Sequence, residues 1–314
     1  MRILVHNDDA TTWRDALAQR LPHAEVITSE EAGDRQAEDF QADYLAVWKP
    51  PTELLQGQTR LKGIVNLGAG VDALLKNPGL PRDVPIVKLR DAGMAPLMAD
   101  YVRFGVLYFQ RDFDRYFAQQ RHAVWHESPL ADKADWPVGV LGLGAIGAHV
   151  AQALAEDGFP VHGWSRSPKS LGGVICHHGD EGLDELLGTV RTLVTLLPDT
   201  ASTRGIVNAR TLARMTDGAS LINPGRGTLI DEEALLAALG PGDKEGRLRG
   251  AVLDAFSEEP LPRDNPLWSH PRVRITPHMA APTPVRDAAD QVAALITALD
   301  NGEDVETIDP GAGY

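Results

Sequence analysis

A glycine-rich segment in the middle of the chain constrains the fold more than any other feature: Val138-Gly139-Val140-Leu141-Gly142-Leu143-Gly144-Ala145-Ile146-Gly147. Its G-x-G-x-x-G spacing follows an apolar run and opens a helical pattern, which is the context that a dinucleotide-binding unit requires. There Gly142 allows a tight turn, Gly144 lets the backbone approach a pyrophosphate, and Gly147 lets the helix pack against the strand. The backbone amides of Ala145 and Ile146, in the first helical turn, would hold the phosphates. The segment predicts a nucleotide-binding domain, and the competing interpretation is a turn whose glycines serve packing alone.

Short apolar runs alternate with amphipathic stretches on both sides of this segment, which predicts parallel sheets flanked by helices. The first series of expected strands comprises residues 2–6, 24–28, 44–47, 63–66 and 85–89. The second series comprises residues 137–141, 160–164, 192–196, 220–223, 250–253 and 273–276. Helical spacing of apolar residues predicts one long helix over about 95–119, and a last helix over about 284–301 that could return to the first domain. We therefore expect an α/β protein with two doubly wound parallel-sheet domains and a cleft between them.

The bulk composition bounds the classes of protein to which the chain could belong. Its 314 residues suit two domains. The net charge of -14 argues against nucleic-acid binding, which needs clustered positive charge. No run approaches the roughly 20 apolar residues of a membrane span, the N-terminus lacks a signal peptide, and the single cysteine, Cys176, fits a reducing compartment. We expect a soluble, cytoplasmic protein with no nucleic-acid and no membrane partner.

The segment after the strand expected at 160–164, Ser165-Arg166-Ser167-Pro168-Lys169, bears on which dinucleotide is bound. An NAD-specific site has an Asp or Glu there, which accepts a hydrogen bond from the ribose 2′-hydroxyl. Ser165 and Arg166 stand in its place, and a guanidinium can make charge-assisted hydrogen bonds to a 2′-phosphate. Ser165, Arg166 and Ser167 are therefore predicted to form a 2′-phosphate clamp to which Lys169 adds charge. This pattern favours NADP (as NADPH), with NAD as the alternative if Arg166 stacks on the adenine or faces solvent.

Three further segments place unusual polar groups at or just beyond the carboxyl ends of expected strands. They are Ile222-Asn223-Pro224-Gly225-Arg226-Gly227, Leu253-Asp254-Ala255-Phe256-Ser257-Glu258-Glu259-Pro260-Leu261-Pro262 and Ile275-Thr276-Pro277-His278-Met279-Ala280-Ala281. In doubly wound sheets that edge faces the ligand crevice. The three segments are therefore candidates for the functional site.

In their order along the chain, the fingerprint, N-x-G-R-G, D-x-F-x-x-E-P-L-P and P-H-x-A-A segments resemble the D-2-hydroxyacid dehydrogenase family, and the resemblance spans nearly the whole chain. Val47-Trp48-Lys49-Pro50-Pro51, Leu67-Gly68-Ala69-Gly70-Val71-Asp72 and Trp164-Ser165-Arg166-Ser167 are similar to its glyoxylate- and hydroxypyruvate-reducing branch. The resemblance implies a flavodoxin-like substrate-binding domain formed by residues 1–98 and 285–314, and a Rossmann cofactor domain formed by residues 99–284. By the same analogy we expect a homodimer, with the helix near residues 95–119 as a contact.

Carried over by motif, Arg226, Glu259 and His278 form the catalytic set that the resemblance implies. Arg226 would hold the carboxylate and carbonyl oxygens of a 2-keto acid in a fixed geometry. His278, when protonated, would polarise the carbonyl and deliver the proton as the alkoxide forms. Glu259, bonded to the other ring nitrogen, would favour the imidazolium; its neighbour Glu258 is the rival, but the family places the acid directly before Pro260. The implied reaction is NADPH-dependent reduction of small 2-keto acids, glyoxylate to glycolate and hydroxypyruvate to glycerate.

Further positions carry over to the substrate and the cofactor. Gly68, Ala69 and Gly70 form a small-residue turn whose amides could bind the substrate carboxylate, with an ordinary turn as the alternative, and Trp48 would wall the substrate pocket or pack inside the domain. Asp254 resembles the family's acceptor for the nicotinamide carboxamide. The other positions assigned to the cofactor are Leu197, Pro198, Thr203, Asn223, Pro224, Gly225, His278 and Ala280. Pro224 departs from the family, which more often has a residue with an amide hydrogen there.

Two other functions compete with this interpretation. Some relatives with this fold are non-catalytic, NAD(P)-sensing corepressors that keep the same three residues, so the triad alone does not exclude a binding protein. The chain has no long tails of the kind that would carry extra interaction segments. A dehydrogenase for another substrate, such as phosphoglycerate, is the second alternative, and 314 residues leave no room for the regulatory domains that this enzyme often carries. No cluster of His, Cys, Asp and Glu has the spacing of metal ligands, so we expect no metal.

Overall fold

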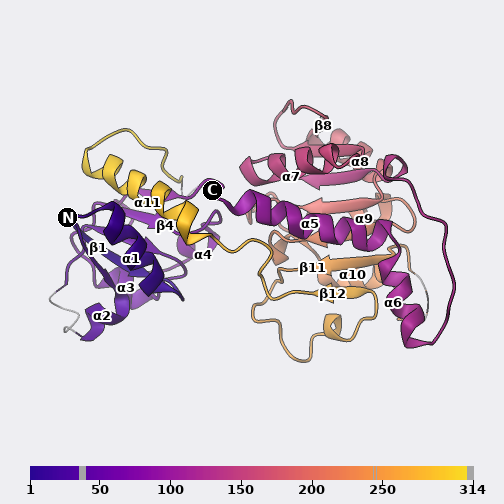
Figure 1. The fold of residues 1–314 in the computed structure, drawn as a ribbon, viewed down its shortest axis with the longest axis horizontal. Coiled ribbons are helices and arrows are strands. Elements are labelled where there is room, and N and C mark those ends of the chain that lie inside the picture. Colours follow the sequence, from indigo (N-terminus) through magenta and orange to yellow (C-terminus); the bar gives the residue numbers. More distant parts are fainter. Residues whose placement is uncertain (35–39, 243, 245, 310–314) are drawn as a thin grey trace. The chain divides into compact units, whose positions relative to one another are not determined.

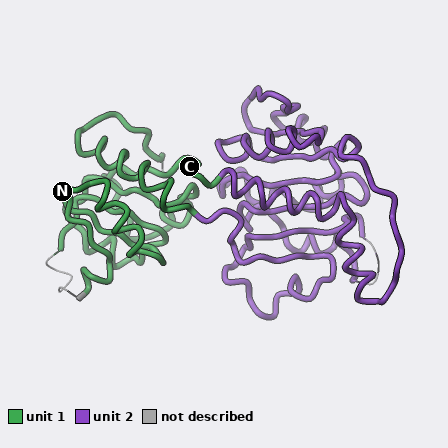
Figure 2. The backbone as a smooth tube through the Cα atoms, in the orientation of Figure 1, with its two compact units in different colours: residues 1–94, 283–314 green, residues 95–282 purple. Residues whose placement is uncertain are grey.

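The computed structural model of the 314-residue chain describes residues 1–34, 40–242, 244 and 246–309. The chain divides into two compact units, Met1–Met94 with Thr283–Tyr314 and Ala95–Pro282 (Figure 2). The polypeptide therefore passes between the units twice, after Met94 and after Pro282. Each unit contains one parallel sheet with helices around it, which confirms the predicted fold class.

The first unit contains a five-stranded sheet in the order β2-β1-β3-β4-β5. All of its strand pairs are parallel, and this order is that of a flavodoxin-like sheet. Its strands are β1 (Arg2–His6), β2 (Glu25–Thr28), β3 (Tyr44–Val47), β4 (Gly63–Asn66) and β5 (Ile86–Lys88). Its helices are α1 (Ala10–Arg20), α2 (Ser29–Asp34), α3 (Thr52–Gln56), α4 (Asp72–Leu75) and α11 (Val285–Asp300).

Burial explains why such short segments form strands in this unit. Every residue of β3 and of β4 is buried, as expected for inner strands of a parallel sheet that is covered on both faces. The last helix, α11, packs on α1 and β4, and its buried residues Ala288, Val292 and Ile296 recur at helical spacing. Arg20 of α1 donates a hydrogen bond to the Asp290 carboxylate of α11, so the C-terminal helix belongs to the first unit.

The second unit contains a seven-stranded parallel sheet in the order β12-β11-β10-β9-β6-β7-β8. Its edge strands, β8 and β12, lie on opposite sides of the unit in Figure 1. Its strands are β6 (Val138–Leu141), β7 (Val161–Ser165), β8 (Val174–His178), β9 (Thr192–Thr195), β10 (Ser220–Asn223), β11 (Gly250–Leu253) and β12 (Val273–Ile275). Its helices are α5 (Met94–Gln110), α6 (Phe113–Arg121), α7 (Ala145–Glu156), α8 (Gly179–Thr189), α9 (Ala209–Arg214) and α10 (Glu232–Leu239), with 3-10 turns at Lys133–Asp135, Gly227–Leu229 and Pro266–Trp268. Among the described residues of either unit, no helix combines the length and the apolar character needed to cross a bilayer.

The order of this second sheet identifies its fold. Counted from β6, the first six strands have the 3-2-1-4-5-6 order of a Rossmann sheet, and β12 adds a parallel strand beside β11. Apolar clusters cover both of its faces. Leu193 and Leu221 belong to one cluster, whereas the next residues, Val194 and Ile222, belong to the other. Neighbouring side chains of each inner strand therefore stabilise opposite faces of the sheet.

Two elements differ from the sequence prediction. Strand β8 was not expected, and the single long helix predicted over residues 95–119 is wrong, because the chain forms α5 and α6 instead. The chain turns between them at Asp112, whose φ of 57° is left-handed. The buried guanidinium of Arg249 binds the carboxylates of Asp112 and Asp114. A long-range ion pair, which helical periodicity does not reveal, thus fixes where the second helix begins.

A pair of histidines lies where α8 packs on β7 and β8. His162 Nδ1 is 2.9 Å from His177 Nε2, and the Glu185 carboxylate lies 3.4 Å from His177 Nδ1. Burial, and next the charge of His177, lower the pKa of His162 below its ordinary value of 6.5, while Glu185 acts in the opposite direction. The folded protein therefore binds this proton less readily than the unfolded chain. The free energy of unfolding is expected to fall as the pH drops through about 6.5.

We predict that His162→Gln makes the free energy of unfolding less dependent on pH between about 7.5 and 5.5, because glutamine keeps a hydrogen-bonding group but does not titrate. Urea unfolding followed by tryptophan fluorescence at the two pH values measures this difference. His149→Gln removes an exposed histidine of α7 and should keep the wild-type pH dependence. An unchanged pH dependence in His162→Gln would contradict the assignment.

Candidate active site

The polar segments singled out in the sequence meet at one edge of the seven-stranded sheet. Asn223 of β10, Leu253 of β11 and Ile275 of β12 are direct neighbours in the strand register, and β6 ends beside β9 in the same way. Because the strands are parallel, the chain leaves the sheet at this edge after each of them. The loops that emerge here carry the glycine-rich turn, Arg226, Glu259 and His278.

Close backbone approaches explain two of the glycines after β6, and open space distinguishes the third. Gly142 has a φ of 104°, and a Cβ there would lie 2.5 Å from the carbonyl oxygen of Leu196. A Cβ at Gly147 would lie 1.9 Å from the carbonyl oxygen of Gly142. Gly144, the N-cap of α7, is exposed, and no described heavy atom beyond its chain neighbours would lie within 4 Å of a Cβ. The approach to the first turn of α7, which begins at Ala145 and Ile146, is therefore open.

The segment after β7, next to the glycine-rich turn, presents cationic side chains at the same edge. The Ser165 hydroxyl is buried and donates to the carbonyl oxygen of Ser167 at 2.8 Å, which closes a tight turn. Arg166, Ser167 and Lys169 are exposed. Ser165 of the predicted 2′-phosphate clamp therefore shapes the turn. The side chains of Arg166, Ser167 and Lys169 are the ones that a ligand can contact.

The loop after β9 is held by its own side chains. The Thr203 hydroxyl donates to the carbonyl oxygen of Pro198 at 2.5 Å and accepts from the Thr200 amide at 2.9 Å. Asp199, which is buried, accepts from Arg204 at 2.7 Å. Leu197 packs on the apolar cluster below the loop, and Pro198 is exposed. The Thr203 side chain thus stabilises the loop by hydrogen bonds within it, whereas Pro198 lies at the loop surface.

The Arg226 loop is folded around the side chain of Asn223, which is fully buried. Its Nδ2 donates to the carbonyl oxygens of Arg226 at 3.0 Å and Ala255 at 3.4 Å. Its Oδ1 accepts from the Thr195 hydroxyl at 2.6 Å and from the Gly225 amide at 3.2 Å. Pro224 and Gly225 are buried and Arg226 is partly exposed. The Asn223 amide is therefore occupied within the protein, and Arg226 is the group of this loop that a ligand can reach.

The Arg226 loop packs directly on the loop that carries Glu259. A Cβ at Gly227 would lie 1.8 Å from the carbonyl carbon of Phe256, so a side chain at this position is excluded. The Phe256 amide in turn donates to Glu259 Oε1 at 3.1 Å. The Arg226 guanidinium and the Glu259 carboxylate therefore extend from two loops whose backbones are in van der Waals contact.

Glu259 binds the imidazole of His278 through both of its oxygens. His278 Nδ1 lies 2.9 Å from Oε1 and 2.8 Å from Oε2. A carboxylate only accepts, so Nδ1 carries the hydrogen, and Nε2 is the nitrogen that can exchange a proton with a ligand. The side chains of His278 and Glu259 are 36% and 27% exposed, so a ligand can reach the pair. The structure places Glu259, and not its neighbour Glu258, against the histidine.

The backbone around His278 is held by Asp254, whose side chain is fully buried. Its Oδ1 accepts from the Met279 amide and its Oδ2 from the Ala280 amide, each at 2.9 Å. The His278 amide donates to the carbonyl oxygen of Asp254 at 2.9 Å. His278 itself has a φ of 51°, which non-glycine residues rarely adopt. The sequence motif did not reveal this contribution of Asp254, because its partners are backbone amides.

The predicted substrate residues of the first unit form a compact turn after β4. The buried Asn66 side chain donates to the carbonyl oxygens of Gly68 at 2.8 Å and Gly70 at 2.9 Å. A Cβ at Gly68 would lie 2.3 Å from the Trp48 ring, so the indole packs on the turn. Ala69 and Gly70 are partly exposed. Trp48 therefore shapes this turn within the first unit.

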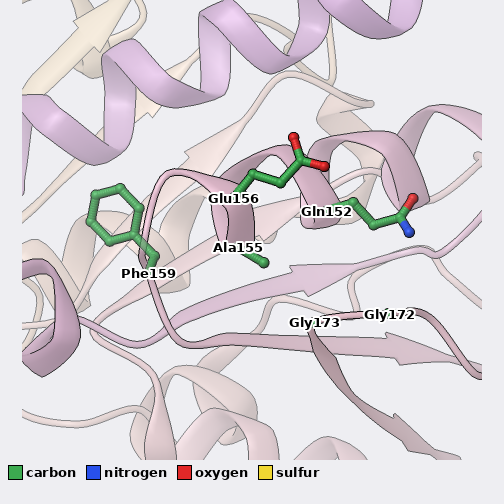
Figure 3. Close-up of a pocket in the computed structure, with 6 residues that line it drawn as sticks. All are labelled: Gln152, Ala155, Glu156, Phe159, Gly172 and Gly173. Carbon is green, nitrogen blue, oxygen red and sulfur yellow. The ribbon is translucent and has the colours of Figure 1, made fainter.

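A cavity of about 350 Å³ lies away from these residues (Figure 3). It is formed by the C-terminal half of α7 and by the turn before β8, and its lining residues are Gln152, Ala155, Glu156, Phe159, Gly172 and Gly173. Its polar groups, Gln152 and Glu156, are exposed side chains. None of the residues predicted for the site lines this cavity, and it is not the candidate site.

The chain is similar to known proteins over almost its whole length. Residues 104–280 match the family model of the D-isomer specific 2-hydroxyacid dehydrogenase NAD binding domain. A glyoxylate/hydroxypyruvate reductase A of Salmonella newport is 43% identical over 312 residues, which cover 98% of this chain and 97% of the relative.

Solved structures agree with this similarity. The D-isomer specific 2-hydroxyacid dehydrogenase from Xanthobacter autotrophicus Py2 in complex with NADPH and MES superposes with a TM-score of 0.90 at 41% identity, over 99% of both chains. The NADPH-dependent glyoxylate/hydroxypyruvate reductase from Sinorhizobium meliloti in complex with NADP and sulfate superposes with a TM-score of 0.91 at 35% identity, over 100% of this chain and 99% of that one.

We predict opposite effects for alanine at two glycines of the fingerprint. Gly147→Ala brings a methyl group against a backbone oxygen and should lower the melting temperature by several degrees. Gly144→Ala should keep the wild-type melting temperature and weaken dinucleotide binding by about tenfold or more, because its methyl group projects into the open approach to α7. Differential scanning fluorimetry and cofactor titration measure the two effects. Equal dinucleotide affinity in Gly144→Ala and wild type would place the phosphates elsewhere.

Proposed function

The chain belongs to the family of D-isomer specific 2-hydroxyacid dehydrogenases, and on this premise we propose that it reduces small 2-keto acids, glyoxylate and hydroxypyruvate, with NADPH. The observation that carries the proposal is the His278–Glu259 pair beside the Arg226 loop. The keto acids named here are those of the relatives from Salmonella and Sinorhizobium. We assign dinucleotide binding, together with the substrate contacts of Arg226 and His278, to the second unit.

The residues at the edge of the second sheet fit a phosphorylated dinucleotide. Gly144 leaves the first turn of α7 open, where the amides at a helix N-terminus favour phosphate. Arg166 and Lys169 supply exposed positive charge after β7, and no acidic residue occupies that turn between Ser165 and Lys169 to repel a 2′-phosphate. These features support NADP binding. When bound, the reduced nicotinamide supplies the hydride that the keto carbon receives.

Arg226 is proposed to bind the substrate through its carboxylate and carbonyl oxygens. A guanidinium presents donors in a rigid plane, which matches two oxygens on adjacent carbons better than an ammonium does. The backbone of Arg226 is fixed through Asn223 and through the contact of Gly227 with Phe256. The amides of the Gly68 to Gly70 turn in the first unit are proposed to bind a carboxylate, since the carbonyls of Gly68 and Gly70 accept from the Asn66 side chain.

His278 is proposed to give the proton that completes the reduction. As the keto carbon is reduced, its oxygen gains negative charge, and the protonated imidazole transfers the Nε2 hydrogen to that oxygen. The product is a 2-hydroxy acid, and the imidazole is left neutral with its Nδ1 hydrogen still bonded to Glu259. The carboxylate stabilises the cationic form before transfer and holds the ring in one orientation. In the reverse reaction the neutral imidazole accepts the proton.

We also propose that the protein forms a homodimer through an aromatic surface on α5 and α6. The surface consists of Phe104, Phe113 and Phe117; Phe104 and Phe117 contact the buried ring of Tyr108, and Phe113 contacts Phe117. Phe104 and Phe117 are each about half exposed, and exposed aromatic clusters of this kind mark protein–protein interfaces. The Arg249 ion pairs hold α6 in place and so shape the surface.

We predict rapid NADPH oxidation with glyoxylate and with hydroxypyruvate. The loss of absorbance of the reduced cofactor measures its rate. His278→Ala should lower kcat by at least about a hundredfold, because the proton donor is removed. Glu259→Gln should lower kcat, since the imidazole loses the carboxylate that binds its Nδ1 and holds the ring in one orientation. Glu258→Gln is the matched control and should keep the wild-type kcat.

Cofactor preference is tested in the same assay. Arg166→Ala should raise the KM for NADPH by about tenfold or more and leave NADH use unchanged, because only NADPH carries the 2′-phosphate. If NADPH binds but no keto acid is turned over, the protein is a nucleotide-sensing protein. Turnover of 3-phosphohydroxypyruvate in preference to glyoxylate would instead favour the phosphoglycerate alternative.

We predict that Phe104→Glu combined with Phe117→Glu converts the dimer into monomers, because two charges on each copy would have to be buried in the interface. Sedimentation velocity measures the change in mass. Ile175→Glu alters an exposed apolar residue of β8, outside the aromatic surface, and should leave the dimer intact. A wild-type monomer would contradict the proposed assembly.

A further inference from the structure

A chain of hydroxyl groups connects helix α5 to the loop that carries His278. The Tyr101 hydroxyl lies 2.6 Å from Thr276 Oγ1, and Thr276 Oγ1 lies 2.5 Å from Asp254 Oδ1. Burial raises the pKa of Tyr101 to about 12, so the phenol keeps its proton at neutral pH. The three side chains come from the helix that opens the second unit and from the ends of β11 and β12.

The direction of these hydrogen bonds follows from the chemistry of the last acceptor. An ionised carboxylate has no hydrogen to give, so the Thr276 hydroxyl donates to Asp254. Its single hydrogen is then used, and Thr276 accepts from Tyr101. The order is therefore Tyr101 to Thr276 to Asp254, each hydroxyl donating to the next group. A hydrogen bond to a charged acceptor, such as the one from Thr276 to Asp254, is stronger than one between neutral groups.

The Asp254 carboxylate, the last acceptor in this series of hydrogen bonds, holds the loop that carries His278. Asp254 accepts the Met279 and Ala280 amides, the two that follow His278. These contacts hold the left-handed backbone at His278 and with it the direction of the imidazole toward Glu259. Losing the Thr276 hydroxyl leaves one oxygen of a buried carboxylate with fewer donors, and the carboxylate can then move away from the loop amides.

We propose that Tyr101 and Thr276 are positioning residues, which hold Asp254 and through it keep the His278 loop in the conformation that proton transfer requires. This inference rests on the proposed function in so far as His278 is the proton donor. The effect of Tyr101 and Thr276 on the loop conformation does not depend on that function, since it concerns the Met279 and Ala280 amides and not the reaction.

A double-mutant cycle on the two hydroxyl groups tests the proposal in the full-length protein. Thr276→Ala should lower kcat about tenfold, the scale of one hydrogen bond to a charged group, with the KM for keto acid within about twofold of wild type. Thr276→Ser keeps the hydroxyl and should restore most of kcat. Tyr101→Phe should lower kcat about threefold in the wild-type background and cause no further loss in Thr276→Ala, because its effect passes through Thr276.

Hydrogen–deuterium exchange of the peptide that spans residues 276–282 gives a readout independent of turnover. Exchange of this peptide should be faster in Thr276→Ala than in wild type, because the Met279 and Ala280 amides are less well held. The matched controls are Thr216→Ala, whose hydroxyl donates to Val190 in the same unit, and Tyr116→Phe, whose hydroxyl accepts from Ser128. Both controls should leave kcat and the exchange of this peptide unchanged.

The outcomes separate this proposal from the proposed function. Additive effects of Tyr101→Phe and Thr276→Ala, or unchanged exchange of the loop peptide, would overturn the positioning role even if the protein is an active reductase. Faster exchange in Thr276→Ala together with a His278→Ala variant of wild-type activity would support the conformational role and reject His278 as proton donor.

Discussion

Buried polar side chains at strand ends are the constraint on which the candidate site depends. Asn66, Asn223 and Asp254 each end or directly follow a strand and are almost completely excluded from solvent. A buried polar group without a partner costs about 1–3 kcal/mol, so the following loop must fold back to supply hydrogen bonds. The first of these side chains binds the turn at 68–70, the second the Arg226 loop, and the third the His278 loop. Hydrogen-bond satisfaction inside the protein thus gives each functional loop one conformation.

Contacts between backbones then relate the loops of the second unit to one another. Gly227 packs against the backbone of Phe256, and Gly147 against the carbonyl of Gly142, at distances that exclude any side chain. Because β10, β11 and β12 end in register, the loops start from neighbouring points. The relative placement of Arg226 and His278 therefore follows from sheet register and glycine contacts, which would hold the proposed catalytic groups in place before a ligand binds.

The sequence predicted those features that depend on local pattern. Alternation of apolar runs predicted the inner strands, because strands such as β3 and β10 are buried on both faces, and the glycine spacing predicted the turn before α7. β8 was missed because its sequence, Val-Ile-Cys-His-His, has neither a continuous apolar run nor a clear alternation. The break between α5 and α6 was missed because it depends on Arg249, more than 100 residues away.

The residues of the candidate site likewise divide into those that a local sequence pattern reveals and those that depend on contacts in the fold. Residue types carried in motifs, such as the glutamate before Pro260, could be predicted from the sequence together with its partner His278. Side chains that act through the backbone could not, because the partners of Asp254 and Asn223 are amides and carbonyls that look alike at every position. The hydroxyls of Tyr101 and Thr276 are 175 residues apart in the sequence. Their interaction requires the packing of α5 beside the end of β12, which no local pattern encodes.

The charge of the protein imposes a last requirement on the proposed site. The chain has a net charge of -14, whereas a phosphorylated dinucleotide and a keto acid are both anions. At physiological ionic strength charges are screened beyond about 8 Å, so the acidic residues distributed over the surface oppose binding only weakly. The cations near a ligand decide the interaction: Arg166 and Lys169 after β7 for the proposed 2′-phosphate site, and Arg226 after β10 for the proposed keto-acid site. A surface that is acidic overall is therefore compatible with anionic ligands, because a few guanidinium and ammonium groups are fixed at one edge of the sheet.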